Sequence, residues 1–220
     1  MTQTTHKDWK KLFINKKNLL IKFRILHCIL ILLVVTSTNL YSKDLFNQNY
    51  LNDDGTFNAI IEIPTGTKTK IEYDQILKDF KVEIVQNTQR KIDYLAYPAN
   101  YGFIPNTLVK KKIGGDGDAV DIIVLGNKLK TGETVKVNIV GMLKLFDNNQ
   151  IDFKVVSINN DENKKIFNLS SFENYYPGAL DLIEIWFLNY KKNTNDNLIT
   201  SNGYVEAQEA IEFIKFTSIK

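Results

Sequence analysis

Residues 114–126 read Gly-Gly-Asp-Gly-Asp-Ala-Val-Asp-Ile-Ile-Val-Leu-Gly, a glycine-rich turn that leads into an apolar run. The turn places Asp116, Asp118 and Asp121 within six residues, where their carboxylates repel one another unless a cation or a proton neutralises them. The glycines allow a tight turn that brings the oxygens together, and residues 122–125 predict a buried strand. Hard divalent cations prefer oxygen ligands, so the pattern favours Mg²⁺ over Zn²⁺.

Two other interpretations of this stretch stay open on the residues alone. Asp-Gly-Asp is common in surface turns that bind nothing. A calcium-binding EF-hand loop is the second, but its spacing is not met. Counted from Asp116, the fifth position is Val120 and the twelfth is Asn127, where that loop needs an oxygen ligand and a glutamate.

The first 42 residues differ in composition from the rest of the chain. Residues 1–24 carry seven Lys or Arg against one acid, residues 25–35 are almost wholly apolar, and residues 36–42 are mostly small or polar. This order is typical of a secretory signal peptide, so we expect residues 1–42 to be a signal peptide or an uncleaved signal anchor. A buried core helix is the alternative. Residues 43–56 are expected to be a linker and residues 57–220 a folded domain.

The leader also carries the residues that give the chain its basic character. Residues 43–220 hold 21 basic and 24 acidic residues, so the net positive charge gives no reason to expect nucleic-acid binding. His6, His27 and Cys28 lie in the leader, which leaves the expected domain without histidine or cysteine. Ser-His-Asp and Cys-His triads, His/Cys zinc sites and disulfides are therefore excluded from that domain. Catalysis would rest on carboxylates, Lys, Arg, Tyr and a hard metal.

The pattern after residue 56 is one of many strands followed by late helices. Strands are predicted at residues 57–63, 70–73, 81–85, 120–125, 134–145 and 151–158. Helices are predicted at residues 179–191 and 204–216, the second with Asn202 as its N-cap. We therefore expect a mainly β fold of the α+β class, a small antiparallel, OB-like β-barrel with two C-terminal helices packed outside it.

From about Asn58 to Phe216, the chain resembles the soluble family I inorganic pyrophosphatases. Their Asp-x-Asp-Pro-hydrophobic-Asp signature is matched by residues 116–121, with Ala119 in place of proline. Asn148 stands where many relatives have glutamate. Further matching segments follow in the family's order: Ile61-Glu62-Ile63-Pro64, Lys70-Ile71-Glu72, Tyr97-Pro98-Ala99-Asn100-Tyr101-Gly102, residues 147–154 and Asn189-Tyr190-Lys191.

The resemblance implies a role for each matched residue. Asp118 would be the general base. The metal ligands would be Asp116, Asp121, Asp147 and Asp152, and the substrate ligands Lys70, Arg90, Tyr101, Lys154, Tyr190 and Lys191. Glu62, Glu72 and Tyr97 would contact the ligating residues, the two glutamates also through waters, and would not bind the substrate directly. The spacing before the Tyr-Pro segment varies in the family, and Arg90 is assigned as the only arginine after residue 42.

Each of these residues also has a plainer interpretation. Lys154 and Lys191 lie in charged stretches and could be solvated. Tyr97 and Tyr101 could be core aromatics of the barrel. Glu62 alternates with Ile61 and Ile63 on its strand and could face solvent.

The function implied by the resemblance is Mg²⁺-dependent hydrolysis of inorganic pyrophosphate (diphosphate) to two phosphates. The enzyme would be a hydrolase of the phosphoanhydride bond that works by direct attack of metal-activated hydroxide. It would use several Mg²⁺ ions per site, with Mn²⁺ or Zn²⁺ as substitutes, and form a homo-oligomer, a hexamer in bacterial relatives. Three competing functions stay open: a non-catalytic module that binds Mg²⁺ or Ca²⁺ and phosphate, an OB-like nucleic-acid binder, and a nucleotide or polyphosphate phosphatase.

The leader decides the expected location. A cleaved leader would deliver the domain outside the inner membrane, to the periplasm, and an uncleaved one would be its only contact with the membrane. Membrane anchoring and the cytoplasm, which is usual for the family, are the alternatives.

Overall fold

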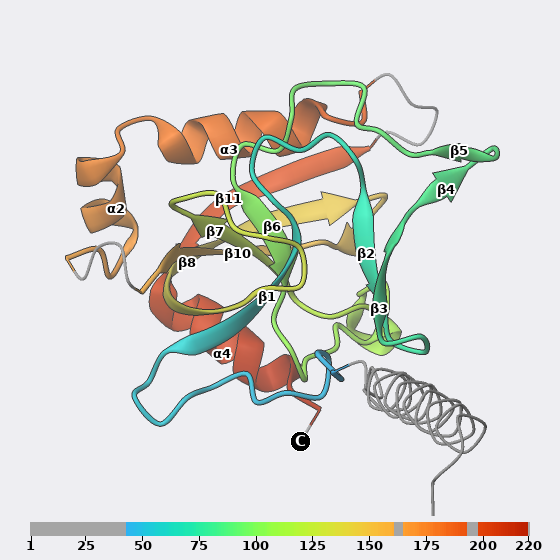
Figure 1. Cartoon of the computed structure of the whole chain (residues 1–220). Coiled ribbons are helices and arrows are strands. Elements are labelled where there is room, and N and C mark those ends of the chain that lie inside the picture. Colours follow the sequence, from blue (N-terminus) through green and yellow to red (C-terminus); the bar gives the residue numbers. More distant parts are fainter. Residues whose placement is uncertain (1–42, 161–164, 193–197, 220) are drawn as a thin grey trace, which may run out of the picture. The chain divides into compact units, whose positions relative to one another are not determined.

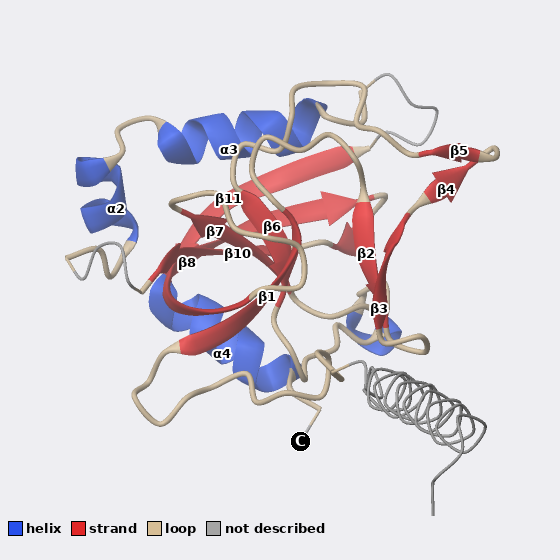
Figure 2. Ribbon diagram, in the orientation of Figure 1, coloured by secondary structure: helices blue, strands red, loops and turns tan. Residues whose placement is uncertain are grey.

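A sheet that closes on itself dominates the computed structural model, which describes residues 43–160, 165–192 and 198–219 (Figures 1 and 2). The expected leader lies outside the described residues. The ring runs β1 (Phe57–Ile63), β6 (Asn100–Phe103), β7 (Asp121–Leu125), β10 (Lys154–Asn159) and β8 (Thr134–Asp147), and β8 pairs again with β1. β11 (Ile199–Glu206) pairs with β8, as does the short β9 (Gln150–Ile151). The expected mainly β fold with a barrel is confirmed.

One pair of strands in the ring differs from the expected antiparallel arrangement. β7 and β10 are parallel, with Asp121 opposite Lys154, whereas the other pairs of the ring are antiparallel. Parallel strands start at the same edge of a sheet, so the loops that precede β7 and β10 lie side by side. A bridge joins Gly115, in the loop before β7, to Ile151 at the end of β9, from which two residues lead into β10.

Two small hairpins stand apart from the ring. β2 (Ile71–Asp74) pairs with β3 (Asp79–Val82), and β4 (Ile84–Val85) pairs with β5 (Thr88–Gln89). In Figure 1 the β4–β5 hairpin projects from the body of the molecule. The strand predicted at residues 81–85 is therefore two strands, and Glu83 lies between them.

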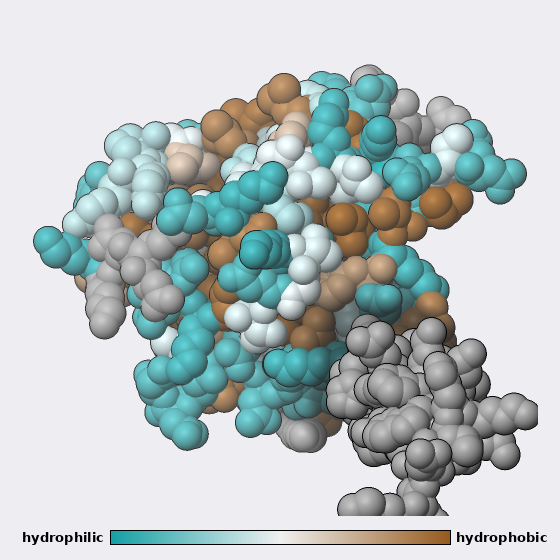
Figure 3. Space-filling model, viewed as in Figure 1, coloured by the Kyte–Doolittle hydropathy of each residue, from teal (hydrophilic) through white to brown (hydrophobic). Residues whose placement is uncertain are grey.

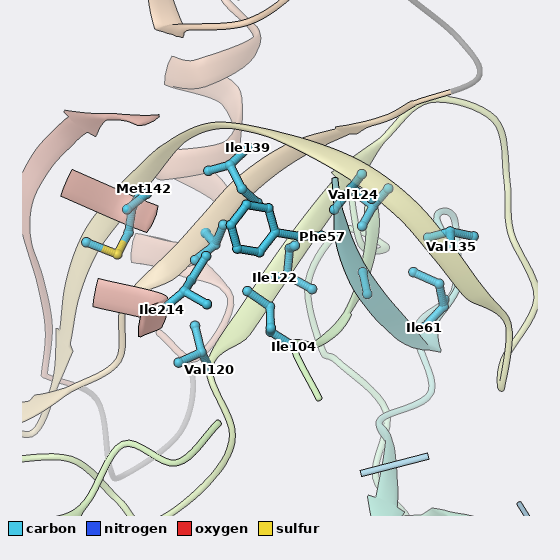
Figure 4. Close-up of a cluster of buried hydrophobic side chains, with 14 of the residues drawn as sticks. Phe57, Ile61, Ile104, Val120, Ile122, Val124, Val135, Ile139, Met142 and Ile214 are labelled. Carbon is cyan, nitrogen blue, oxygen red and sulfur yellow. The ribbon is translucent and has the colours of Figure 1, made fainter. Parts of the chain in front are cut away.

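Helices pack on the two faces of the strands. Ile122 and Val124 of β7 belong to a buried cluster with Ile214 of α4 (Ala207–Thr217), and most of this cluster is drawn in Figure 4. Ile123 belongs to a second cluster with Trp186 of α3 (Ala179–Asn189). Because successive side chains of a strand point to opposite faces, α3 and α4 cover different faces of β7. None of the described helices is both long and apolar enough to cross a membrane.

Two helical elements were missed. η1 (Lys111–Ile113) precedes the aspartate loop, and α2 (Leu169–Tyr175) precedes α3. α2 begins with a capping box in which the Ser171 amide donates to the Asn168 side chain and the Asn168 amide to the Ser171 hydroxyl.

Along α3, Leu182 and Ile185 stay exposed, and the apolar surface there is visible in Figure 3.

The predicted start of the last helix was wrong. Residues 204–206 belong to β11, where Tyr204 pairs with Leu143 and Val205 with Met142, and α4 begins at Ala207. Glu206 and not Asn202 is the N-cap, without a side-chain capping bond. Pairing with the long strand β8 extends β11 up to the start of α4. The order of apolar and polar residues along the chain does not reveal that pairing.

The stretch expected as a linker contributes to the core. Leu45 and Phe46 are 8% and 7% exposed and cluster with Ile60 and Phe103. The Leu45 amide donates to the Tyr73 hydroxyl at 3.1 Å, and the Phe46 carbonyl accepts from the Asn106 amide at 2.7 Å. Residues 45–46 are thus held to the domain by backbone hydrogen bonds and by the packing of their side chains.

We expect Phe46→Ala to lower the free energy of unfolding by about 3 kcal/mol or more, because it removes a buried aromatic ring from this cluster. The matched control is Phe167→Ala, since Phe167 is 66% exposed and should change stability by less than about 0.5 kcal/mol. Urea unfolding of both variants measures the difference. Equal losses would show that residues 45–46 are not part of the folded core.

Candidate active site

A cleft of about 270 Å³ lies where β7 and β10 begin. Its walls carry seven carboxylates, from Glu62, Glu72, Asp116, Asp118, Asp121, Asp147 and Asp152, and four cations, from Lys70, Arg90, Lys154 and Lys191. Tyr101 and Tyr190 also line it. All the residues assigned to the site from sequence therefore meet in one cleft, except Tyr97.

The aspartate loop is shaped by its glycines. Gly117 has a φ of 100°, in the left-handed region, and a Cβ on Gly115 would lie 2.2 Å from the Val109 carbonyl oxygen. The Asp118 amide donates to Asp116 Oδ1 at 2.9 Å, and the Asp118 carbonyl accepts from the Val109 amide. The loop backbone is thus held from within and from the neighbouring segment, and the carboxylates of Asp116 and Asp118 both line the cleft.

Lys154 lies between two of the carboxylates. The parallel pairing of β7 and β10 puts it opposite Asp121, and its Nζ donates to Asp121 Oδ2 and to Asp152 Oδ1, each at 2.5 Å. Its side chain is 3% exposed. Burial opposes the charge on Lys154, but the two carboxylates outweigh it and hold the Lys154 pKa above its usual range. Lys154 is therefore a buried ammonium group, paired with two carboxylates, and not a solvated one.

A second lysine–aspartate pair closes another side of the cleft. Lys191 follows α3 and forms an ion pair with Asp147. Tyr190, the C-cap of α3, stacks on Trp186 with ring centroids 4.9 Å apart and planes 9° from parallel. α3 thereby presents a tyrosine and a lysine to the cleft on a rigid support.

Asn148 sits in the tight turn that follows Asp147. Asn148 and Asn149 have φ values of 50° and 67°, and Asp147 pairs with Gln150 across the turn. Asparagine tolerates this left-handed conformation better than most residues. The turn therefore gives a backbone reason for asparagine at this position.

The two tyrosines of the Tyr-Pro segment are both buried, but only one reaches the cleft. Tyr101 lines it, with Lys70 Nζ 5.5 Å and Lys154 Nζ 5.6 Å from its ring centroid. Burial raises the Tyr101 pKa, so the phenol keeps its proton and can donate a hydrogen bond. Tyr97 packs behind it, with centroids 5.5 Å from Tyr101 and 4.7 Å from Trp186. For Tyr97 the structure shows a core aromatic that supports Tyr101.

Glu62 faces the cleft and not solvent. It is 8% exposed, and its Oε1 accepts from the Tyr73 amide at 2.7 Å. Burial raises its pKa to about 7, against the opposing effect of Lys70. Lys70 Nζ lies 3.2 Å from Glu72 Oε1.

Arg90 enters the cleft from the end of the β4–β5 hairpin. Its Nη1 donates to both carboxylate oxygens of Glu83, at 2.9 and 2.8 Å. Glu83 itself does not line the cleft among the described residues.

The cleft also contains residues that sequence reasoning missed: Phe46, Tyr73, Gln75, Phe103 and Ala119. Phe46 lay in the expected linker and Gln75 in the turn after β2, so neither carried a signal. The Asx-type turn at Asp74, whose side chain accepts from the Ile76 and Leu77 amides, could have indicated where β2 ends.

The charges of the cleft determine what it can hold. Its seven carboxylates outnumber its four cations, so it favours additional positive charge. All the surplus donors are oxygens, which fits hard divalent cations such as Mg²⁺. Among the residues that the structure describes, no group of three or more carboxylates is arranged as a metal site, and Lys154 and Lys191 lie against three of the assigned ligands.

The buried carboxyl of Glu62 predicts a pH-dependent stability in EDTA. A pKa raised from 4.5 to about 7 means that the folded state binds the Glu62 proton more tightly than the unfolded state does. The wild type should therefore lose stability relative to Glu62→Gln as the pH rises from about 4.5 to about 7, by up to about 3 kcal/mol, and no further above that. Denaturant unfolding of both proteins from pH 4.5 to 8 measures this. A difference that is constant with pH would contradict the burial of a protonated carboxyl.

Comparison with known proteins places this arrangement in a family. The family model described as inorganic pyrophosphatase matches residues 59–219. The soluble inorganic pyrophosphatase of Oryza sativa subsp. indica is 31% identical over 162 residues, which cover 73% of this chain and 70% of that protein. The probable inorganic pyrophosphatase of Plasmodium falciparum is also 31% identical, over 74% of this chain and 53% of that protein. This chain thus spans about half the length of the latter relative.

Solved structures agree with the family model. The crystal structure of inorganic pyrophosphatase from Thermus thermophilus matches with a TM-score of 0.67 and 26% identity, over 79% of this chain and 96% of that one. The fold, the matched residues and the relatives together show that the chain belongs to the inorganic pyrophosphatase family.

Proposed function

We propose that this chain hydrolyses inorganic pyrophosphate to two phosphates. The observation that carries the proposal is the gathering of four cations and seven carboxylates in one small cleft. A compact polyanion needs cations around its oxygens, and the carboxylate surplus would hold the metal ions that bring the rest of the positive charge. Arg90 can form a fork on phosphate oxygens, whereas Lys70, Lys154 and Lys191 act as point charges.

Asp118 is the proposed general base. Burial, followed by the nearby charges of Asp116 and Asp121, raises the Asp118 pKa, which makes its carboxylate a better proton acceptor. It would accept a proton from the water that attacks one phosphorus. The bond from that phosphorus to the bridging oxygen breaks, and the second phosphate leaves with the electron pair. Tyr101 and Tyr190 would donate hydrogen bonds to phosphate oxygens as charge builds up on them.

The proposed metal is Mg²⁺, with Mn²⁺ or Zn²⁺ as substitutes. Asp116, Asp121, Asp147 and Asp152 would hold the ions, and Glu62 and Glu72 would act through waters. When bound, such ions neutralise phosphate oxygens and lower the pKa of a bound water. The chain's own contribution is an all-oxygen ligand set and a buried ammonium group at Lys154 that donates to two of the carboxylates.

The direct experiment is phosphate release from pyrophosphate, ATP and a short polyphosphate, with and without Mg²⁺. Selective, Mg²⁺-dependent release from pyrophosphate is expected. We expect Asp118→Asn to keep the fold and lose turnover by about 10² to 10⁴, the usual contribution of a general base. Asp93→Asn is the matched control, because Asp93 is exposed and outside the cleft. Wild-type turnover in Asp118→Asn would remove that residue from the role of base.

Two further proposals concern the whole protein. We propose that residues 1–42 act as an export leader and that the domain forms a homo-oligomer, a hexamer as in bacterial relatives. N-terminal sequencing of the protein from separated cell fractions, and light scattering of the purified chain, check the two points. Soluble cytoplasmic protein that keeps Met1 would contradict the leader, and a monomeric mass would contradict the assembly.

A further inference from the structure

Glu83 and Arg90 face each other across the base of the β4–β5 hairpin. The register pairs Ile84 with Gln89 and Val85 with Thr88, and one further step along both strands places Glu83 opposite Arg90. The turn is fixed by Gln86 and Asn87, whose φ values of 49° and 62° are those of a tight two-residue hairpin turn. A register set by such a turn leaves the cross-strand pair no freedom to slip.

The backbone ties this pair to a second cation of the cleft. The Arg90 amide donates to the Glu83 carbonyl at 2.8 Å, the Glu83 amide to the Lys70 carbonyl at 3.0 Å, and the Lys70 amide to the Arg90 carbonyl at 3.0 Å. These three bonds form a closed cycle. Residues 70, 83 and 90 are thus held side by side at the base of the β4–β5 hairpin.

The side-chain bonds between the two residues use only part of the guanidinium. Nη1 of Arg90 donates to both oxygens of Glu83, and within the described residues Nη2 and Nε donate no hydrogen bond. The guanidinium is planar and rigid, so fixing one nitrogen orients the others. Arg90 lines the cleft and Glu83 does not, so the carboxylate that holds the guanidinium lies outside the cleft lining.

We propose that Glu83 is a positioning residue that orients the Arg90 guanidinium toward the phosphate oxygens of the substrate. The inference rests on the proposed function, because it assigns the substrate contact to Arg90. Lys70 has its own partner in Glu72, so Glu83 serves the arginine alone among the cleft's cations. Arg90 is the only arginine after residue 42, and a lysine could not be oriented in this way because its ammonium is a point charge.

A simple surface ion pair is the alternative explanation. Glu83 and Arg90 side chains are 27% and 30% exposed, and exposed pairs contribute little to stability. Such a pair would affect unfolding alone and would leave substrate binding unchanged. A positioning residue, in contrast, affects KM more than kcat and only while Arg90 is present.

The test is the steady-state kinetics of Glu83→Ala with pyrophosphate and Mg²⁺. We expect KM to rise about tenfold with kcat changed less than about threefold, and Glu83→Gln, which keeps one acceptor oxygen, to show a smaller rise. In an Arg90→Lys background, Glu83→Ala should change KM less than about twofold. Glu209→Ala is the matched control, because it removes the partner of Lys144 at the start of α4, outside the cleft, and should leave KM unchanged.

Two results would overturn the inference: an unchanged or lower KM in Glu83→Ala, or an equal rise in KM with and without Arg90. Failure of the proposed function is a separate outcome, since the wild type would then release no phosphate from pyrophosphate. In that case, calorimetric binding of inorganic phosphate to the wild type and to Glu83→Ala decides the matter. About tenfold weaker binding by the variant supports positioning, and equal binding refutes it.

Discussion

The buried ammonium group of Lys154 between Asp121 and Asp152 is the interaction on which the site depends. An isolated charge at this depth would be costly, and two carboxylates so close to each other would repel. Together they satisfy one another, but only because β7 and β10 run parallel and start at the same edge of the sheet. That single exception in an otherwise antiparallel ring brings the aspartate loop and the segment before β10 to one place. The position of the carboxylates in the cleft therefore depends on the pairing of β7 with β10.

Much of this arrangement could be predicted from sequence, because the strongest signals were local. The run of glycines and aspartates before β7 indicated both a tight turn and a hard-cation site, and the absence of His and Cys excluded most other chemistries. Long-range pairing was beyond such signals. The parallel pairing of β7 with β10, the extension of β11 to Glu206 and the packing of Phe46 against Phe103 each depend on partners distant in the chain. The resemblance assigned Tyr101 to the substrate and Tyr97 to a supporting position, but the two residue types do not differ, and it is the packing of Tyr97 on Trp186 that places Tyr97 behind Tyr101.

The surplus of carboxylates in the cleft lies against strands whose side chains are packed into the core. Burial raises the pKa of Glu62 to about 7, and burial with the nearby carboxylates raises the pKa of Asp118, so both groups lower the stability of the folded chain when they ionise. The strands behind the cleft offset this with fully buried Ile61, Ile63, Ile122 and Val124. A soft support would let the carboxylates move apart and relax, and their affinity for cations would fall. Repulsion between the carboxylates favours cation binding only while the packed strands keep the carboxylates close together.

The β4–β5 hairpin holds one cation of the cleft, Arg90, in place in a similar way. An arginine on a loose connection could reach the cleft, but it would lose rotamer freedom each time it bound a phosphate. A two-residue turn fixes the strand register, the register sets Glu83 opposite Arg90, and the carboxylate holds one nitrogen of the guanidinium. The rotamer freedom that Arg90 would lose on binding a phosphate is thereby lost already on folding. Sequence spacing alone could not place Arg90, because the strand pairing of this hairpin, and not the distance to the Tyr-Pro segment, brings the residue to the cleft.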